Sequence, residues 1–446
     1  MKRAFLTPNA AMRLNYPLAA LFVAALSQTA LGQNATPPPG YFDIPAGFDF
    51  PADKRLLEDY RLQPNMPAQR LHVWNVFAGM TRPTSNDGLL VFETWFSEKE
   101  TFQKSTAVAA ARTQQSVRTF SVPSQFSSLR RRAGVAAPQP GSAVLSTVLY
   151  NFAAYNHIRS NRLHIPSVLQ DLAKNGAPDV KIPQNRTVPP FPANSIVLKT
   201  VWWPVARDRV SAMPIWDPDA NPAVPTGNPK ESWARFVGVD ATRKSVPSGE
   251  TADITYDGQV KRGSHIVGLG NFHFIQLTAE MAAGVNSDGL LARVAQASFG
   301  RPVAADDFAV LVATHLTTKE IDDWVWATFW WHDRPQEGAF AGNRVGALEG
   351  VWKNYLMDVA YDLNLPSERD GSPRVAFNPW VEARFQNDGH GGGMVSNCMN
   401  CHNRASTGAD DFLPIYRGNP DFSGDTAYAP GSLRTDFLWS ILLPHD

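Results

Sequence analysis

The feature that most constrains the fold of this chain is a series of five apolar runs in its middle. Between residues 190 and 335 these runs are rich in β-branched and aromatic residues, and loops with glycine, proline and aspartate separate them. Such a pattern is typical of short antiparallel strands, so the sequence predicts a β-sandwich-like core. The runs are residues 195–205, 233–239, 265–278, 308–314 and 324–331.

Helical patterns flank this core. Residues 142–158 and 345–359 each place large apolar side chains at helical spacing, which predicts two amphipathic helices. Residues 97–100 have the form of a helix start, and residues 317–320 have the form of a capping box, which predicts one helical turn between the last two strands. The expected fold class is α+β, with an antiparallel β-sandwich-like core, a helical N-terminal region and a helical or irregular C-terminal segment.

Composition excludes several classes of protein. The 446 residues contain 41 Lys+Arg and 41 Asp+Glu, so a basic nucleic-acid-binding protein is not expected. No stretch after the first thirty residues approaches the roughly 18 apolar residues of a membrane span. Residue composition and apolar patterning divide the chain into four parts. These are residues 1–32, a mixed and partly helical region 33–189, the β-rich core 190–335 and a C-terminal segment 336–446.

The N-terminus is typical of an export signal. Basic residues precede an apolar run at residues 17–26, and small residues follow at residues 30–32. We expect cleavage after Gly32 and export of the remaining chain. The alternative is an uncut N-terminal anchor, although the apolar run is short for a membrane span.

The chain has two cysteines, Cys398 and Cys401, and His402 follows the second one directly. This C-x-x-C-H run comes after Ser396 and Asn397, either of which can cap the N-terminus of a helix with its side-chain oxygen. Two thiols three positions apart at the start of a helix lie on one side of it. The histidine then occupies the next position of the same turn.

This run resembles the haem-attachment motif of c-type cytochromes. The resemblance implies one haem c per chain, bound covalently through Cys398 and Cys401, with His402 as the proximal iron ligand. In that family the haem is attached outside the cytoplasm, which agrees with the export signal and implies a periplasmic location.

Three other interpretations of the cysteine pair are open. The pair could form a structural disulfide in an oxidising compartment, although such a short loop constrains little chain. A thioredoxin-like redox pair would need a βαβ context that the Gly-, Asn- and Asp-rich flanks do not provide. A zinc site would need a second pair of ligands, and the sequence places none at a suitable spacing.

The sequence departs from small soluble cytochromes c in its distal ligand. The 44 residues after His402 contain no methionine, so the usual axial Met cannot be assigned there. We expect either an open sixth position or a histidine. His332 is the first choice, because Asp333 could orient its imidazole, and His315 is the second. Further candidates are His445, and His390 and Met394 in the loop before the motif.

Several aromatic residues lie where they could cover a haem. The interpretations are a wall over an apolar macrocycle or simple packing of the sheet and loops. The residues are Trp324, Trp326 and Trp330, which share a face at the two-residue period of a strand, together with Phe377, Trp380, Phe385, Phe412 and Trp439.

Two classes of function follow from the resemblance. In the first, the protein is a periplasmic monohaem cytochrome that transfers electrons to or from a redox partner protein or a small donor or acceptor. In the second, it is a haem enzyme of the oxidase or peroxidase type, with an open sixth coordination position. A haem-based sensor is a weaker alternative. The motif indicates a haem but no substrate, so the sequence favours the electron carrier and leaves the question of an enzyme open.

Overall fold

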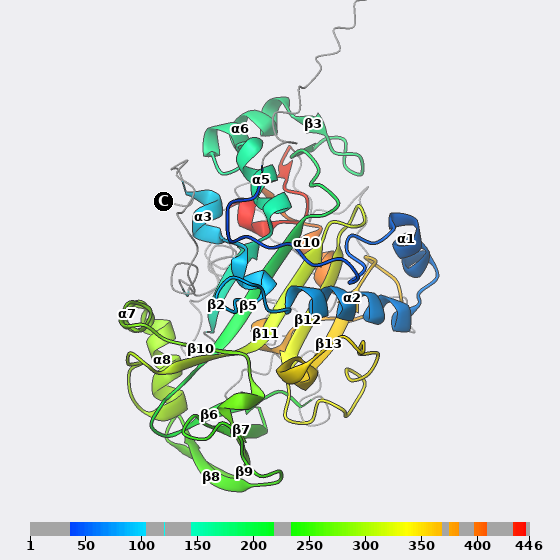
Figure 1. The fold of residues 1–446 in the computed structure, drawn as a ribbon. Coiled ribbons are helices and arrows are strands. Elements are labelled where there is room, and N and C mark those ends of the chain that lie inside the picture. Colours follow the sequence, from blue (N-terminus) through cyan, green and yellow to red (C-terminus); the bar gives the residue numbers. More distant parts are fainter. Residues whose placement is uncertain are drawn as a thin grey trace, which may run out of the picture. The chain divides into compact units, whose positions relative to one another are not determined.

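The computed structural model has the α+β fold that the sequence predicts. An antiparallel main sheet is accompanied by two small mixed sheets and by N-terminal helices (Figure 1). The residues that the structure describes belong to one compact unit, which spans Ala35–Asp446. They are residues 36–103, 120, 144–217, 233–367, 374–382, 397–407 and 431–442.

The main sheet combines strands from distant parts of the sequence. Its strand order is β1-β2-β5-β11-β12-β13, every neighbouring pair is antiparallel, and β10 also pairs with β11. The strands therefore come from the N-terminal, middle and C-terminal ranges that the sequence distinguishes. Their bounds are β1 Phe96–Ser97, β2 Leu145–Tyr150, β5 Ile196–Val205, β10 Phe274–Gln276, β11 Phe308–Thr318, β12 Val325–Trp331 and β13 Tyr355–Ala360.

Two small sheets complete the β-structure. The second sheet has the order β6-β7-β9-β8, and the third has the order β14-β15-β4-β3. Each contains one parallel pair, β7 with β9 and β15 with β4. The second sheet consists of β6 Val210–Ile215, β7 Arg235–Asp240, β8 Thr251–Tyr256 and β9 Gln259–Gly268. The third sheet consists of β3 Ala177–Pro178, β4 Arg186–Thr187, β14 Ser406–Thr407 and β15 Leu433–Arg434.

The helices are short, apart from α2, and many begin at a polar side chain that caps them. Asp53, Asn65, Asn151 and Asp288, for example, each accept a hydrogen bond from a backbone N–H of the first turn. No helix among the described residues is long and apolar enough to cross a lipid bilayer. The bounds are α1 Lys54–Leu62, α2 Met66–Met80, α3 Glu98–Phe102, α5 Phe152–Ser160, α6 Pro166–Asn175, α7 Ala279–Ser287, α8 Gly289–Phe299, α9 Pro379–Glu382 and α10 Cys398–His402, with 3-10 turns η1 Val91–Thr94, η4 Leu269–Asn271, η5 Gly350–Asn354 and η6 Trp439–Leu442.

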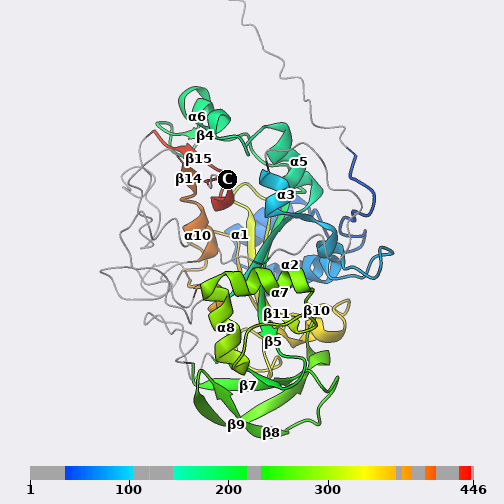
Figure 2. The ribbon, with the colours of Figure 1, turned by 90° about the vertical axis from the view of Figure 1, so that its left-hand side faces the viewer.

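Helix α2 covers one face of the main sheet, and α10 lies on the other (Figure 2). On the face named here the α2 face, Phe77 of α2 stacks on Phe329 of β12, with ring centroids 4.1 Å apart. Side chains alternate along a strand, so the even-numbered residues of β12 point to the face opposite Phe329. Trp326 and Thr328 accordingly meet residues of α10 and of the segment before α9. We call this second side the α10 face.

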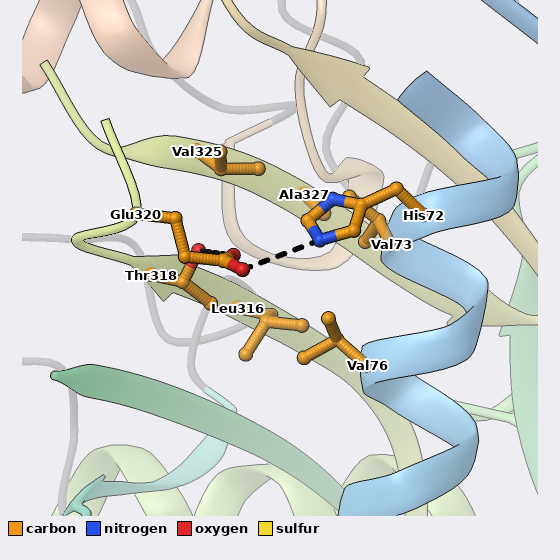
Figure 3. A pocket seen from close by; sticks show the side chains of 8 residues that line it. All are labelled: His72, Val73, Val76, Leu316, Thr318, Glu320, Val325 and Ala327. Carbon is orange, nitrogen blue, oxygen red and sulfur yellow. Dashed lines mark hydrogen bonds and ion pairs between the residues drawn. The ribbon is translucent and has the colours of Figure 1, made fainter. Parts of the chain in front are cut away.

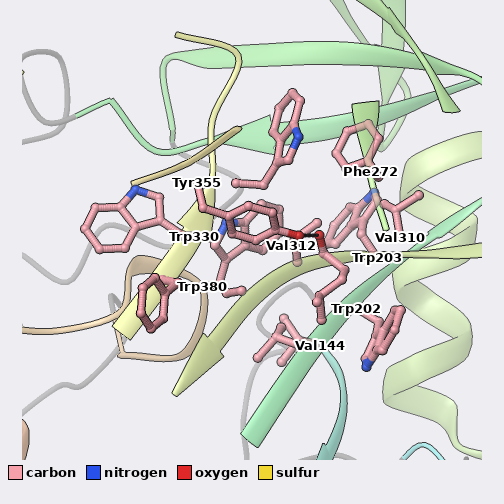
Figure 4. Packing of buried hydrophobic residues seen from close by; sticks show 14 of the residues in the cluster. Val144, Trp202, Trp203, Phe272, Val310, Val312, Trp330, Tyr355 and Trp380 are labelled. Carbon is pink, nitrogen blue, oxygen red and sulfur yellow. Dashed lines mark hydrogen bonds between the residues drawn. The ribbon is translucent and has the colours of Figure 1, made fainter. Parts of the chain in front are cut away.

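A continuous aromatic core joins the main sheet to the second sheet and to the C-terminal segment (Figure 4). Trp380 of α9 packs edge-on against Trp203 of β5 and Trp233, and Trp330 packs against Trp216. Replacing one such buried aromatic side chain by alanine typically costs about 3–5 kcal/mol of stability. The α9 segment is therefore held firmly on the α10 face.

The predicted runs correspond to β5, β7, the end of β9, β10, β11 and β12, and two predicted helices are wrong. Residues 145–150, predicted as helix, form β2, and only α5 after them is helical. Residues 355–359, also predicted as helix, belong to β13, which follows the 3-10 turn η5. All side chains of both strands are buried, so their sequences show no alternation of apolar and polar residues, and apolar spacing alone cannot distinguish such strands from helices.

The turn between β11 and β12 is a third correction. The sequence predicts one helical turn at residues 317–320, but β11 continues to Thr318 and a non-helical turn follows. The hydroxyl of Thr318 donates to the carboxylate of Glu320 at 2.5 Å, so the residues that resemble a capping box serve the turn instead. At residues 97–100 the prediction is confirmed, because Ser97 and Glu100 form a capping box on α3.

Candidate cofactor-binding site

The C-x-x-C-H run forms the short helix α10. The side-chain oxygen of Asn397 accepts a hydrogen bond from the backbone N–H of Asn400 at 2.9 Å, which confirms Asn397 as a cap. The side-chain amide of Asn397 also donates to the backbone oxygen of Asp362 at 3.2 Å. Cys398 and Met399 are buried, and α10 packs against β12. The motif is thus seated on the main sheet.

The orientation of the His402 ring is set by one backbone carbonyl. Nδ1 of His402 lies 2.8 Å from the backbone oxygen of Phe437. A carbonyl oxygen only accepts, so Nδ1 carries the proton and donates, and Nε2 keeps the lone pair. One face of the ring lies against Trp326, with ring centroids 4.2 Å apart. This tautomer is the one in which Nε2 can bind a metal ion.

The imidazole of His402 is neutral over the physiological pH range. Burial lowers its pKa to about 3, the hydrogen bond to Phe437 opposes that shift, and the positive charge of Lys199 adds to it. A neutral ring does not have to release a proton before it can act as a ligand. His402 therefore has both the tautomer and the charge state of a ligating histidine.

Two residues from distant parts of the chain join Cys398. His315 lies on β11, directly opposite Thr328 of β12 and Lys199 of β5. Its ring, the carboxylate of Glu382 and the sulfur of Cys398 offer three atoms that all lie within 4.8 Å of one another. Nitrogen, oxygen and sulfur donors in one buried cluster form a set that can hold a transition metal.

Burial shifts the pKa values of Glu382 and His315 in this cluster toward the neutral forms of both side chains. It raises the pKa of Glu382 to about 7, against the opposing effects of the Asn378 N–H and of Lys199. It also holds the pKa of His315 well below its usual value, and the positive charge of Lys199 lowers it further. His315 Nε2 lies 3.3 Å from Glu382 Oε1, but it is buried and makes no hydrogen bond within the described part of the chain. A buried nitrogen without a partner is an available ligand atom.

Asn378 fixes Glu382 to the sheet. The backbone N–H of Asn378 donates to Glu382 Oε2 at 2.7 Å. Its side-chain amide donates to the hydroxyl of Thr328 at 2.6 Å and to the backbone oxygen of Phe329 at 3.1 Å. Glu382 is therefore held beside His315 by contacts with β12.

The structure places the first-choice distal histidine elsewhere. His332 follows β12 at the end away from Trp326, and six residues of strand correspond to about 20 Å. Its Nδ1 accepts a hydrogen bond from the backbone N–H of Arg334 at 2.9 Å. Asp333 pairs with Arg235 at 2.5 Å and with His265 at 2.9 Å, whereas its oxygen lies 3.6 Å from His332. Of the two preferred histidines, His315 is the one brought to the motif.

Other residues named from the sequence divide into two groups. Trp326 contacts the motif, whereas Phe377 packs against Trp216 in the core, and Trp439 is buried. Trp324 packs against Phe191, and Trp330 and Trp380 belong to the aromatic core. Other predictions lie outside the described residues: the segment 1–32, the side chain of Cys401, His390, Met394, Phe385, Phe412 and His445.

Sequence reasoning did not find Lys199 or Glu382. One signal was visible, because Lys199 is the single charged residue in the apolar run at residues 195–205. A lone charge in a buried strand often marks a polar site. Nothing near Glu382 in the sequence indicates its position, since only the tertiary fold brings it to His315.

A second buried histidine and glutamate pair lies on the α2 face (Figure 3). His72 of α2 points at Glu320, with Nε2 and Oε1 3.3 Å apart, and its Nδ1 lies 2.6 Å from the hydroxyl of Tyr361. Glu320 accepts hydrogen bonds from the backbone N–H of Ala52 at 2.7 Å and from Thr318. Apolar side chains of α2, β11 and β12 line the remainder of this pocket.

No family model, curated protein or solved structure matches this chain. A functional conclusion therefore rests on the residues of the α10 face.

Proposed function

We propose that this protein is an exported monohaem c-type cytochrome that transfers electrons. In this proposal Cys398 and Cys401 attach the haem covalently, and His402 is the proximal iron ligand. The observation that carries the proposal is the C-x-x-C-H run on a capped helix, in which the hydrogen bond from His402 Nδ1 to Phe437 leaves Nε2 for the metal.

The residues present fit the group that the motif implies. The helix brings Cys398 and His402 to one turn, the imidazole is neutral, and its ring is oriented from behind by a backbone carbonyl. A bound haem would supply a one-electron couple between ferric and ferrous iron. The role of the chain is to hold that group, to fix its axial ligand and to surround it with apolar side chains such as Trp326.

We propose His315, rather than His332, as the distal ligand. The support is the position of His315 beside Cys398, while His332 is held at the far end of β12. The buried Nε2 of both histidines lacks a hydrogen-bond partner in the described residues, so position alone decides between them. Two axial histidines would occupy both open positions of the iron. This is why the electron-carrier function is preferred over the oxidase- or peroxidase-like enzyme.

The proposal includes a periplasmic location after removal of residues 1–32 and a redox partner that is a protein or a small donor or acceptor. The export-like N-terminus supports the location. Cell fractionation and N-terminal sequencing test it. A mature chain that begins near Gln33 in the periplasmic fraction is the expected result, and recovery in salt-washed membranes would contradict it.

A second candidate function is a mononuclear metal site without haem. The cluster of His315, Glu382 and Cys398 favours it, because zinc binds nitrogen, oxygen and sulfur ligands. That site needs Cys398 as a thiolate, whereas haem attachment converts the same sulfur to a thioether. The two functions therefore exclude each other at Cys398.

One experiment separates the two candidates. The protein is secreted from a host that attaches haem c, denatured, and examined on a gel by haem staining, while its iron and zinc contents are measured. We expect one haem per chain in the wild type and none in Cys398→Ser/Cys401→Ser. Stoichiometric zinc without haem would reject the cytochrome and favour the metal site.

A second experiment tests the distal ligand through the absorption spectrum. Wild-type ferric protein should be low-spin, and His315→Ala should be high-spin and bind carbon monoxide in the ferrous state. His332→Ala is the matched control and should remain low-spin. A high-spin wild type that binds carbon monoxide rapidly would instead indicate an open sixth position and favour the enzyme.

A further inference from the structure

The carbonyl that orients His402 belongs to a turn with an unusual backbone. Asp436 and Phe437 have φ values of 48° and 69°, so two successive residues with side chains adopt the left-handed conformation. Residues other than glycine rarely adopt it, and their surroundings must hold them there. The position of the Phe437 oxygen therefore depends on the contacts of this turn.

A nearly buried ion pair supplies those contacts. Nζ of Lys319 lies 2.6 Å from Asp436 Oδ1, and the two side chains are 8% and 10% exposed. Asp436 also accepts hydrogen bonds from the indole N–H of Trp324 at 3.3 Å and from the backbone N–H of Phe191 at 3.0 Å. Nζ of Lys319 donates in addition to the backbone oxygen of Asp322 at 2.7 Å. The turn is thus fastened to the loop that joins β11 to β12.

The same turn is joined to α10 from its other side. The backbone N–H of Thr435 donates to the oxygen of Ala405 at 3.1 Å, and β14 pairs with β15 just before the turn. The hydrogen bond from His402 to Phe437 therefore closes a ring of contacts between α10 and the turn. Lys319 and Asp436 act on the opposite side of that ring, and among the described side chains they contact neither His402 nor Cys398.

We propose that Lys319 and Asp436 are positioning residues that set the strength of the hydrogen bond from His402 Nδ1 to Phe437. The proposal rests on the proposed function, in which Nε2 of His402 binds iron. A strong hydrogen bond at Nδ1 makes the imidazole more basic at Nε2. A more basic ligand stabilises the more highly charged ferric state, so the pair keeps the reduction potential low.

The test removes the pair without changing the net charge. Lys319→Met/Asp436→Asn eliminates one positive and one negative side chain together, so the charge near the iron is unchanged in sum. We expect the reduction potential of the secreted holoprotein to rise relative to wild type, because the turn relaxes and the hydrogen bond at Nδ1 weakens. The potential is measured by a spectroscopic redox titration.

A matched control separates this effect from a general loss of charged pairs. Lys54→Met/Asp322→Asn removes an exposed pair from the same neighbourhood, with side chains 54% and 80% exposed, and should leave the potential unchanged. Lys319→Arg keeps the positive charge and an N–H donor, so its reduction potential should stay close to that of the wild type.

A milder variant covers the case in which the double variant does not fold. Trp324→Phe removes the indole N–H that donates to Asp436, keeps an aromatic ring at the position and should shift the potential in the same direction by a smaller amount. A holoprotein whose potential equals that of wild type, while its free energy of unfolding falls, would overturn the positioning role and leave the proposed function intact. Wild-type protein without haem would overturn the proposed function, and this inference with it.

Discussion

The two faces of the main sheet each bury a histidine beside a glutamate, and their surroundings differ. On the α2 face, the carboxylate of Glu320 accepts hydrogen bonds from Ala52 and Thr318 and lies beside His72. On the α10 face, the carboxylate of Glu382 accepts a hydrogen bond from Asn378 and lies beside His315 and the sulfur of Cys398. Nε2 of each histidine lies 3.3 Å from the neighbouring carboxylate and makes no hydrogen bond in the described residues, so the two pairs differ in their other neighbours.

This difference in neighbours is why we interpret the pair on the α2 face as structural and propose the pair on the α10 face as part of a binding site. The network of Glu320 connects the segment before α1, helix α2 and the end of β11, and Tyr361 extends it beyond β13. Such a network stabilises the packing of elements that are distant in sequence. The pair on the α10 face instead adjoins Cys398, and the three residues offer atoms that could hold a metal ion. A buried histidine and glutamate therefore acquire a functional meaning only from what surrounds them.

The largest expected effect is on haem content, which should differ between variants on the two faces of the main sheet. Cys398→Ser/Cys401→Ser should abolish covalent haem completely, because both thioether bonds are lost. Glu320→Gln, on the opposite face, should keep the full haem content. The measurement is haem absorption of the denatured protein per chain. Equal loss of haem in both variants would mean that general folding, rather than the motif, controls attachment.

The second prediction concerns the buried contacts of Glu320 on the α2 face. Glu320→Ala leaves the Ala52 N–H and the Thr318 hydroxyl without their buried acceptor and removes the carboxylate that lies beside His72. Breaking a buried pair in this way typically costs about 3–5 kcal/mol. Urea unfolding should therefore show a loss of this size, with an unchanged absorption spectrum in the folded holoprotein. A loss below about 1 kcal/mol would contradict the structural role.

The third prediction uses the pH dependence of Glu382. Because burial raises its pKa to about 7 from 4.5, the folded state keeps a proton that the unfolded chain releases between these pH values. This carboxyl consequently lowers stability as the pH rises through that window. Glu382→Gln removes the effect, so its stability relative to wild type should increase by about 2–3 kcal/mol between pH 5 and pH 8.

The difference in the free energy of unfolding between Glu382→Gln and the wild type contains the contribution of Glu382, because the other titrating groups are the same in both proteins. Unfolding curves at several pH values provide the measurement, and Glu58→Gln on α1 serves as a control on a partly exposed glutamate. A stability difference that stays constant with pH would contradict the raised pKa of Glu382.

The smallest expected effect concerns an exposed pair. Lys54 and Asp322 lie 2.6 Å apart near the α2 face, but their side chains are 54% and 80% exposed. Water and salt screen such a pair, so Lys54→Met should change the free energy of unfolding by less than about 1 kcal/mol. A loss comparable to that of Glu320→Ala would erase the distinction between exposed and buried ties.

The sequence predicts the α+β class and, in the main sheet, β5, β10, β11 and β12, because these strands keep a clear β-branched and aromatic composition. It fails at β2 and β13, whose side chains are all buried. Burial on both faces removes the alternation on which the distinction between strand and helix depends. Their neighbours in the sheet, which no local pattern specifies, decide their conformation.

The candidate site divides in the same way. Cys398, Cys401 and His402 are adjacent in sequence, and the cap at Asn397 is local, so both can be predicted. His315 and Glu382 reach Cys398 only through strand pairing and the packing of α9. Likewise, the partner of His402 is a backbone carbonyl, which leaves no signature in the side-chain sequence.

The most direct test of the account is the intact mass of the secreted protein after denaturation. The account predicts a single species heavier than the mature polypeptide by one haem, and loss of that increment in Cys398→Ser/Cys401→Ser. A wild-type mass equal to that of the bare polypeptide, from a host that attaches haem c to other proteins, would contradict the assignment of the α10 face as a haem site.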